Sequence, residues 1–364
     1  MGRRPARLAA ALCLLLAAPL HAQSPVGSDA QIGWDALKAG DADRAATAFS
    51  SALRQHPNDA AAHLGAGVAA HLLGHDRDAV VSLGRALELE PRLVQAAELL
   101  GQLTYQQGDI DAAIQVYERA LTRAPGTDAM RKRLEAWRAE ATIHHTLTER
   151  HDGRFTITFD GQADDALATR AAGVLDAAYW RIGSALNTYP GDGIFVILYT
   201  EQQFRDITRA PAWAGGAFDG KIRVPTRGAS QDLPQFDRIL VHELAHAMVF
   251  SLAPRGVPAW LHEGLASYFE RRDPASAQAR LRRSTAPIPF SQLQGSFGQF
   301  SDAQAVQAYD ESLIAADVLV RMLGPQVGVL LQGLGDGQSF EQALRRVGVQ
   351  PADFESQFAE RLKH

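Results

Sequence analysis

The stretch VHELAHAMVF, from Val241 to Phe250, decides the interpretation of the C-terminal part of this chain. His242 and His246 are four residues apart, so on a helix they lie one turn above each other and can direct both imidazoles at a single ion. Glu243 lies about 100° further around the helix axis, from which it reaches a water on that ion without binding the ion itself. The spacing therefore fits the H-E-x-x-H pattern of catalytic zinc sites.

The residues around this motif are apolar on nearly every side of the predicted helix, which indicates that the helix is buried. They are Ile239, Leu240, Val241, Leu244, Ala245, Met248 and Val249. Three ionisable groups in a buried helix are costly unless they are paired or bound to a metal. The alternative, a buried helix whose polar residues are satisfied in the core, does not easily account for three such groups together.

A catalytic zinc needs a third protein ligand, and the segment VPAWLHEGLASYFE, residues 257–270, offers one. Pro258 suits the first turn of a helix, and Glu263 follows His246 with 16 residues between them. That length allows a turn and a returning helix that brings the carboxylate beside the two imidazoles. His262 is the rival ligand, but it lies about 100° from Glu263 around the helix, so only one of them faces the ion.

HELAH followed by WLHEGLASYFE resembles the gluzincin metallopeptidases, and in particular the bacterial peptidase MA-like domains, over about residues 154–364. The resemblance implies one Zn²⁺ bound by His242, His246 and Glu263, with Glu243 as the general base for a zinc-bound water that hydrolyses peptide bonds. Gluzincins usually provide a tyrosine or histidine on a later helix to stabilise the oxyanion, and Tyr309 is the candidate. Its alternative role is that of a core aromatic residue.

Two departures from the gluzincin pattern are visible. Thermolysin-like enzymes often have an acidic residue four positions after the ligand glutamate, and Ser267 stands there in this chain, with Asp237 as a possible substitute. Aminopeptidases of the group carry a glutamate on the edge strand that binds a free amine. GGAFDGKIRVP, residues 215–225, contains no glutamate, which favours an endopeptidase that binds its substrate by strand addition along 217–224.

The N-terminal part repeats itself every 34 residues: Gly40, Gly74 and Gly108 share this spacing, as do Pro57, Pro91 and Pro125. The same period relates the alanines Ala45, Ala79 and Ala113 and the bulky residues Phe49, Leu83 and Tyr117. These columns resemble the tetratricopeptide repeat family, which implies helix pairs that present a groove to a protein partner. Three repeats, followed by a capping helix that begins after Thr127, account for residues 31–140.

The first 22 residues have the pattern of a signal peptide: Arg3, Arg4 and Arg7 precede an apolar stretch from Leu8 to Leu20. Cys13, the chain's one cysteine, lies within it, so the mature protein is expected to have no disulfide and to bind metal through histidine and carboxylate. Removal of the peptide leaves 33 basic and 41 acidic residues, a net charge of −8. This charge argues against nucleic acid as a partner. No second long apolar run is expected, hence no integral membrane segment.

The sequence thus predicts four parts: a signal peptide (1–22), an all-α tetratricopeptide-repeat solenoid (31–140), a polar linker (141–153) and a thermolysin-like α+β metallopeptidase domain (154–364). The strand pattern of residues 154–160 and 194–199, followed by helices, supports the α+β class. The expected function is that of an exported zinc endopeptidase, periplasmic or secreted, whose repeats recruit a protein substrate or partner. The alternative is a non-catalytic repeat scaffold with an inactive metallopeptidase-like domain.

Overall fold

The computed structural model describes residues 29–161, 164–191, 193–208, 215–226, 228–283 and 286–363. The predicted signal peptide, including Cys13, lies outside these residues. The chain divides into two compact units, Met1–His145 and Thr146–His364. This division agrees with the predicted order of a helical solenoid followed by an α+β domain.

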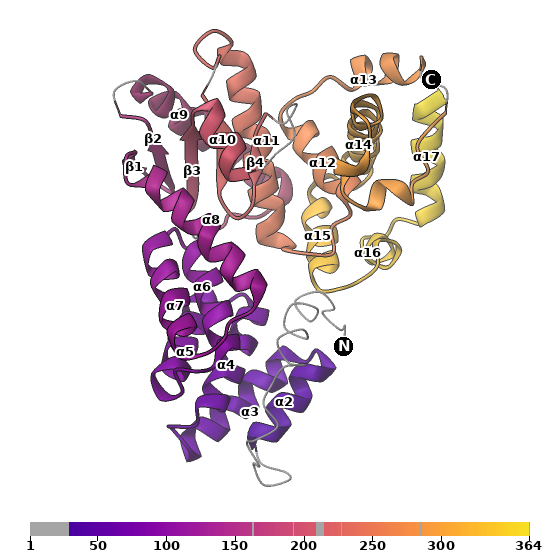
Figure 1. Ribbon diagram of the computed structural model, residues 1–364. Helices are drawn as coiled ribbons and strands as arrows, with labels where there is room; N and C mark the ends of the chain where they lie inside the picture. Colours follow the sequence, from indigo (N-terminus) through magenta and orange to yellow (C-terminus); the bar gives the residue numbers. More distant parts are fainter. Residues whose placement is uncertain are drawn as a thin grey trace. The chain divides into compact units, whose positions relative to one another are not determined.

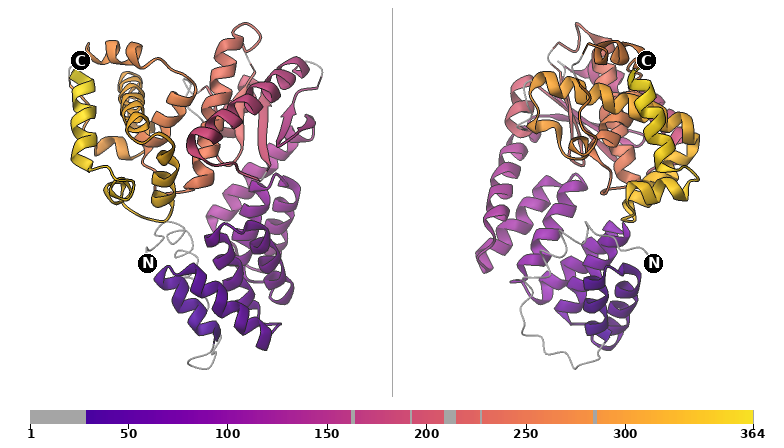
Figure 2. Two further views of the ribbon diagram at one scale, coloured as in Figure 1. Left: turned by 180° about the vertical axis from the view of Figure 1, so that it is seen from behind. Right: turned by 90° about the vertical axis from the view of Figure 1, so that its right-hand side faces the viewer.

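The first unit consists of antiparallel helix pairs stacked in chain order (Figure 1; Figure 2). Its described helices are α2 (Asp29–Ala39), α3 (Ala42–Gln55), α4 (Ala60–Leu73), α5 (Asp76–Leu89), α6 (Val94–Gln106), α7 (Ile110–Arg123) and α8 (Asp128–His144). The three repeated glycines lie just after α2, α4 and α6. Gly40, Gly74 and Gly108 have φ of 78°, 83° and 91°, a left-handed conformation that favours glycine and ends the first helix of each pair.

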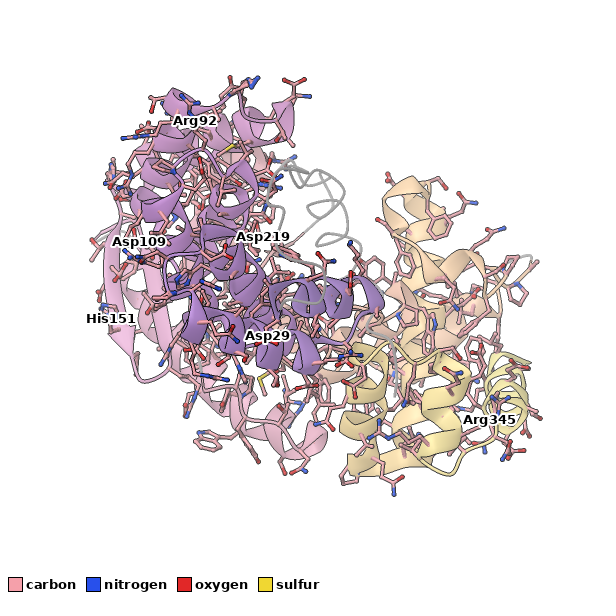
Figure 3. The ribbon with its side chains drawn as sticks, turned by 90° about the horizontal axis from the view of Figure 1, so that it is seen from below. Asp29, Arg92, Asp109, His151, Asp219 and Arg345 are labelled. Atoms are coloured by element: carbon pink, nitrogen blue, oxygen red, sulfur yellow. The ribbon has the colours of Figure 1, made fainter. Side chains whose placement is uncertain are left out.

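Aspartates begin several of these helices. Asp109, labelled in Figure 3, accepts a hydrogen bond of 2.9 Å from the Ala112 N–H at the start of α7. Asp41 and Asp59 do the same for α3 and α4. An aspartate at this position satisfies a backbone N–H group that has no partner within the helix.

Small residues let the paired helices of the repeats approach closely. A Cβ added to Gly65 would lie 2.2 Å from the Phe49 ring, and one added to Gly101 would lie 2.3 Å from the Tyr117 ring. The rings are completely buried, as are the repeated alanines. The repeat columns are therefore the core positions of the solenoid, as the 34-residue period predicts.

The last helix of the unit corrects one boundary. Thr127 begins α8 as predicted, because its hydroxyl accepts a hydrogen bond from the Met130 N–H. The predicted linker 141–153 contains the division between the two units after His145, but it is not an irregular segment, since α8 continues to His144 and strand β1 (Thr148–Asp152) follows almost at once. The polar composition of β1 reflects its place at the edge of a sheet, where four of its five side chains are exposed.

The second unit contains a five-stranded sheet in the order β1-β2-β3-β5-β4. Its remaining strands are β2 (Phe155–Phe159), β3 (Ile194–Tyr199), β4 (Ala217–Phe218) and β5 (Ile222–Pro225). The central strands β2, β3 and β5 are parallel, and the edge strands β1 and β4 are antiparallel to their neighbours. The predicted strands of residues 154–160 and 194–199 are thus present as β2 and β3, and the predicted edge along 217–224 contains β4 and most of β5.

Helices α9 (Asp165–Leu186) and α11 (Leu233–Leu252) pack on the buried side chains of the sheet, which include Ile157, Val196 and Ile222. The short helix α10 (Glu201–Thr208) joins β3 to the residues before β4. Beyond the sheet lie α12 (Ala259–Phe269), α13 (Pro274–Leu281), α14 (Asp302–Leu323), α15 (Val327–Gly335), α16 (Phe340–Arg346) and α17 (Pro351–Lys363). Figures 1 and 2 show α12, α13 and α17 around α14, which contacts all three.

The helical stretch Asp302–Gly335 is long and apolar enough to cross a membrane by length and composition alone. It is the one such stretch in the described residues, and 61% of its most apolar window is buried inside the protein. The expectation that no second long apolar run exists is therefore wrong. The burial explains the composition instead, because α14 is the central helix of the C-terminal layer and supplies residues such as Leu319 to the core.

Candidate metal centre

His242, His246 and Glu263 meet at one point between α11 and α12. Each offers a ligand atom, and the three atoms all lie within 4.8 Å of one another. The Nε2 atoms of His242 and His246 are 3.4 Å and 3.5 Å from Oε2 of Glu263. The two histidines are one turn apart on α11, and the returning helix α12 brings the glutamate to them, as the spacing predicts.

His246 is buried, His242 and Glu263 are partly buried, and one of the ligand atoms has no hydrogen-bond partner among the residues that the structure describes. Oε2 of Glu263 is buried without a hydrogen bond in the described part of the chain, although it faces both imidazoles. A buried carboxylate oxygen without a hydrogen bond is costly. Its position between two ring nitrogens fits a metal ligand, because a cation would satisfy all three atoms together.

In the metal-free protein, the protonation of each ligand depends on the charges of its neighbours. Burial alone would raise the pKa of Glu263, but His246 and His242 hold it well below its usual range. Burial alone would lower the pKa of His242, but the neighbouring carboxylates of Glu263 and Glu270, at 3.4 Å and 3.5 Å, raise it to about 10. The metal-free site therefore favours a protonated imidazole beside an ionised carboxylate.

Glu243 does not belong to this cluster and lies on the neighbouring face of α11. Its side chain is buried, and burial raises its pKa, a shift that the two histidines oppose. A Cβ added to Gly216 would lie 2.6 Å from Oε1 of Glu243, so the carboxylate packs against the backbone just before β4. The glutamate thus lies between the histidine pair and the edge of the sheet.

Comparison with known families identifies both units. A model described as the Peptidase MA superfamily matches residues 181–359, and one described as tetratricopeptide repeat matches residues 31–80 and 75–128. The C-terminal unit is a Peptidase MA superfamily domain. Tetratricopeptide repeats precede it, as the resemblance implied. A search of curated proteins found no match.

The peptidase MA domain orients His242 with a carboxylate that the sequence analysis missed. Oε2 of Glu270, on the residue after the last residue of α12, is 3.5 Å from Nδ1 of His242, the ring nitrogen that does not face Glu263. A carboxylate at this nitrogen selects the tautomer and the ring orientation of a metal-binding histidine. The signal was present in the sequence, because Glu270 follows Glu263 by seven residues and positions seven apart lie on one helix face.

The two residues considered for this orienting role do not perform it. Asp237 forms a bidentate ion pair with Arg170, with both distances at 2.7 Å. Ser267 is completely buried, and its hydroxyl has no hydrogen-bond partner in the residues that the structure describes. The suggestion that Asp237 replaces the missing acid at position 267 is therefore wrong, since the acid lies one turn beyond Ser267.

The rival ligand His262 lies beside the cluster. Its ring stacks on that of His246, with centroids 4.5 Å apart and an angle of 18° between the planes. Burial and the neighbouring His246 lower the pKa of His262 to about 3, so its imidazole is neutral. Stacking restricts the ring of His246, whose Nδ1 atom has no hydrogen-bond partner among the described residues.

Tyr309, on α14, lies near Glu263 and Glu243. Burial raises the pKa of its phenol, and the negative charges of Glu263 and Glu243 together with a hydrogen bond to Glu263 raise it further. Its ring also contacts Phe297 edge to face, with centroids 5.5 Å apart. The residue thus has the packing of a core aromatic and a protonated hydroxyl at the candidate metal ligand. Its catalytic role stays a prediction.

Proposed function

We propose that this protein is a zinc-dependent endopeptidase of the gluzincin type. The observation that carries the proposal is the convergence of His242, His246 and Glu263 on one point, with Glu243 beside them. Peptidase MA superfamily domains are typically zinc-dependent metallopeptidases, which supports the same assignment.

The donor atoms fit zinc in type and in spacing. Zinc takes imidazole nitrogen and carboxylate oxygen at about 2.0–2.2 Å, and in a tetrahedron such ligands are about 3.4 Å apart. Oε2 of Glu263 is 3.4 Å and 3.5 Å from the two Nε2 atoms. Three protein ligands leave one tetrahedral position for water or substrate, as catalytic zinc sites require. The mature chain is expected to contain no cysteine, so nitrogen and oxygen ligands are the ones that it offers.

When bound, zinc would act as a Lewis acid that lowers the pKa of water to about 7 and polarises the substrate carbonyl. Glu243 takes the proton of the attacking water and delivers it to the leaving amine. Burial raises its pKa, which makes the carboxylate a stronger base than a solvent-exposed glutamate. Tyr309 stays protonated because its pKa is raised, so its hydroxyl can donate a hydrogen bond to the oxyanion of the tetrahedral intermediate.

The position of β4 at an edge of the sheet suits the binding of an extended peptide substrate. This strand is one of the two outermost strands of the described sheet, and the backbone before it packs against Glu243. A peptide added to this edge would bind through main-chain hydrogen bonds and place its carbonyl near the base. No glutamate occurs between residues 215 and 225 to bind a free amine, which favours cleavage within a chain over removal of its first residue.

Export and protein recruitment are further parts of the proposal. The basic and apolar pattern of residues 1–22 supports export to the periplasm or beyond. Tetratricopeptide repeats suggest protein–protein interaction, so the first unit would bind the substrate or an assembly partner. N-terminal sequencing of the exported protein should begin near Gln23, and an uncleaved N-terminus would contradict the export assignment.

The decisive experiment compares the wild type with Glu243→Gln on a casein-type substrate, both loaded with zinc. The wild type should cleave casein, and the variant should bind zinc normally yet lose at least about a hundredfold in rate, because it lacks a general base. Equal rates would favour the alternative, a repeat scaffold with an inactive domain. Metal analysis with His246→Ala tests the site separately, and an unchanged metal content would exclude these ligands.

A further inference from the structure

Two phenylalanines lie together beside the edge strand, one on the strand and one on the helix that carries the histidines. The rings of Phe218 and Phe250 are in edge-to-face contact, with centroids 5.6 Å apart and an angle of 67°. Phe250 is 39% exposed although it is a large apolar residue, and Phe218 is half-buried. The catalytic proposal uses neither residue.

The strand and the helix run side by side in the same direction. A Cβ on Gly215 would contact Ile239 at 3.1 Å, a Cβ on Gly216 would contact Glu243, and the ring of Phe218 contacts Phe250. The three contacts, two just before β4 and one on it, thus follow the chain order of their partners on α11, which are one turn and then two turns apart. Phe250 follows Glu243 by seven residues, so both lie on the same face of the helix.

The alternation of side chains along a strand relates the phenylalanine pair to the base. Gly216 and Phe218 both face α11, because a Cβ on Gly216 would contact Glu243 and the Phe218 ring contacts Phe250. Gly216 leaves room for Glu243, and Phe218 fills the next such position. A peptide paired with the outer edge of β4 has its side chains on the same sides as their partners. Its residue opposite Phe218 would therefore point toward Phe250.

From this arrangement we propose that Phe218 and Phe250 form a specificity subsite for a large apolar side chain of the substrate. In a peptide antiparallel to β4, the selected residue lies two positions N-terminal to the residue opposite Gly216, next to Glu243. The role of this subsite in substrate selection rests on the proposed peptidase function. Its position follows from pairing of the peptide with β4. The occupant is an apolar side chain because both rings are apolar and the Phe250 ring is 39% exposed to solvent.

Binding to an inactive protein tests the subsite without requiring catalysis. Two fluorescein-labelled octapeptides, identical except for Phe or Ser at the selected position, are titrated into zinc-loaded Glu243→Gln protein and followed by anisotropy. The Phe peptide should bind on the order of tenfold more tightly, since burial of an aromatic side chain contributes at least that much. When Phe250→Ala is added to the Glu243→Gln protein, the Kd of the Phe peptide should rise to that of the Ser peptide. The Kd of the Ser peptide should not change.

Val329→Ala is the matched control, because Val329 is equally exposed at 39% on α15 and lies outside the proposed subsite. It should leave both Kd values unchanged, and thermal unfolding should show that each variant is folded. Equal binding of the two peptides, no binding of either, or an equal effect of Phe250→Ala on both would overturn the subsite. Failure of the wild type to cleave casein would overturn the peptidase function alone. Failure of the subsite and failure of the peptidase function are therefore distinguishable.

Discussion

Replacement of Gly216 by alanine probes the contact between the edge strand and the general base. The added Cβ would lie 2.6 Å from Oε1 and 2.8 Å from Cγ of Glu243, closer than side chains pack in folded proteins. Gly216 is not among the described glycines with positive φ, so alanine adds no backbone strain there. The effect of the substitution should therefore come from displacement of the carboxylate.

The expected magnitude follows from the size of this displacement. Ordinary contact begins at 3.4 Å, so the carboxylate or the strand must move by about 0.8 Å from the distance of 2.6 Å. Glu243 is buried, with the histidines on one side and the strand on the other, and the movement would carry it away from the attacking water. A misplacement of about 1 Å costs roughly a hundredfold in rate. We expect kcat for peptide cleavage to fall by about that factor, with zinc content unchanged.

Gly215→Ala is the matched control for this experiment. Its Cβ would lie 3.1 Å from Cδ1 of Ile239, the mobile end of a side chain that has no catalytic role. It should change kcat by less than about threefold, because rotation of the isoleucine relieves the contact. If Gly216→Ala cleaves a fluorogenic peptide as fast as the wild type, or if both variants lose activity equally, the proposed contact with the base is refuted.

Other substitutions test the ligands and the helix packing. Glu270→Gln should weaken zinc binding by about 10–100-fold in a chelator competition, whereas Asp237→Asn should not, since Asp237 pairs with Arg170 away from the site. In metal-free protein the pKa of His242 is raised from 6.5 to about 10, so its stabilising effect is complete below pH 6.5 and is lost as the pH rises through about 10. The Tm of the metal-free protein should therefore fall over this range, and His242→Gln should flatten the curve; equal slopes would contradict the ion pair. Gly264→Ala would place its Cβ 2.3 Å from the Ser312 carbonyl oxygen and should destabilise the domain by about 1–3 kcal/mol in urea unfolding. Gly173→Ala, with open space around its Cβ, should stabilise it slightly, and a reversed order would count against the packing of α12 on α14.

Local sequence determined much of this protein. The 34-residue period identifies the repeat helices because each column is a packing position that recurs in every helix pair. The pair His242 and His246 follows from helix geometry alone, since residues four apart face the same way whatever surrounds them. Glu263 is also accessible from the sequence, because a short connection after α11 brings the next helix back along it.

Tertiary structure decided which other groups serve this centre. Both Ser267 and Glu270 lie within two turns of Glu263. The crossing of α12 over α11 brings Glu270 to His242, and it leaves the Ser267 hydroxyl buried without a hydrogen-bond partner in the described residues. The contacts of Gly216 with Glu243 and of Phe218 with Phe250 join segments more than 25 residues apart, so no local pattern reveals them. Strand β1 was missed because an edge strand with exposed side chains has the composition of a linker. The spacing of the two histidine ligands is thus a property of one helix, whereas the orientation of the ligands and the shape around them depend on how helices and strands cross.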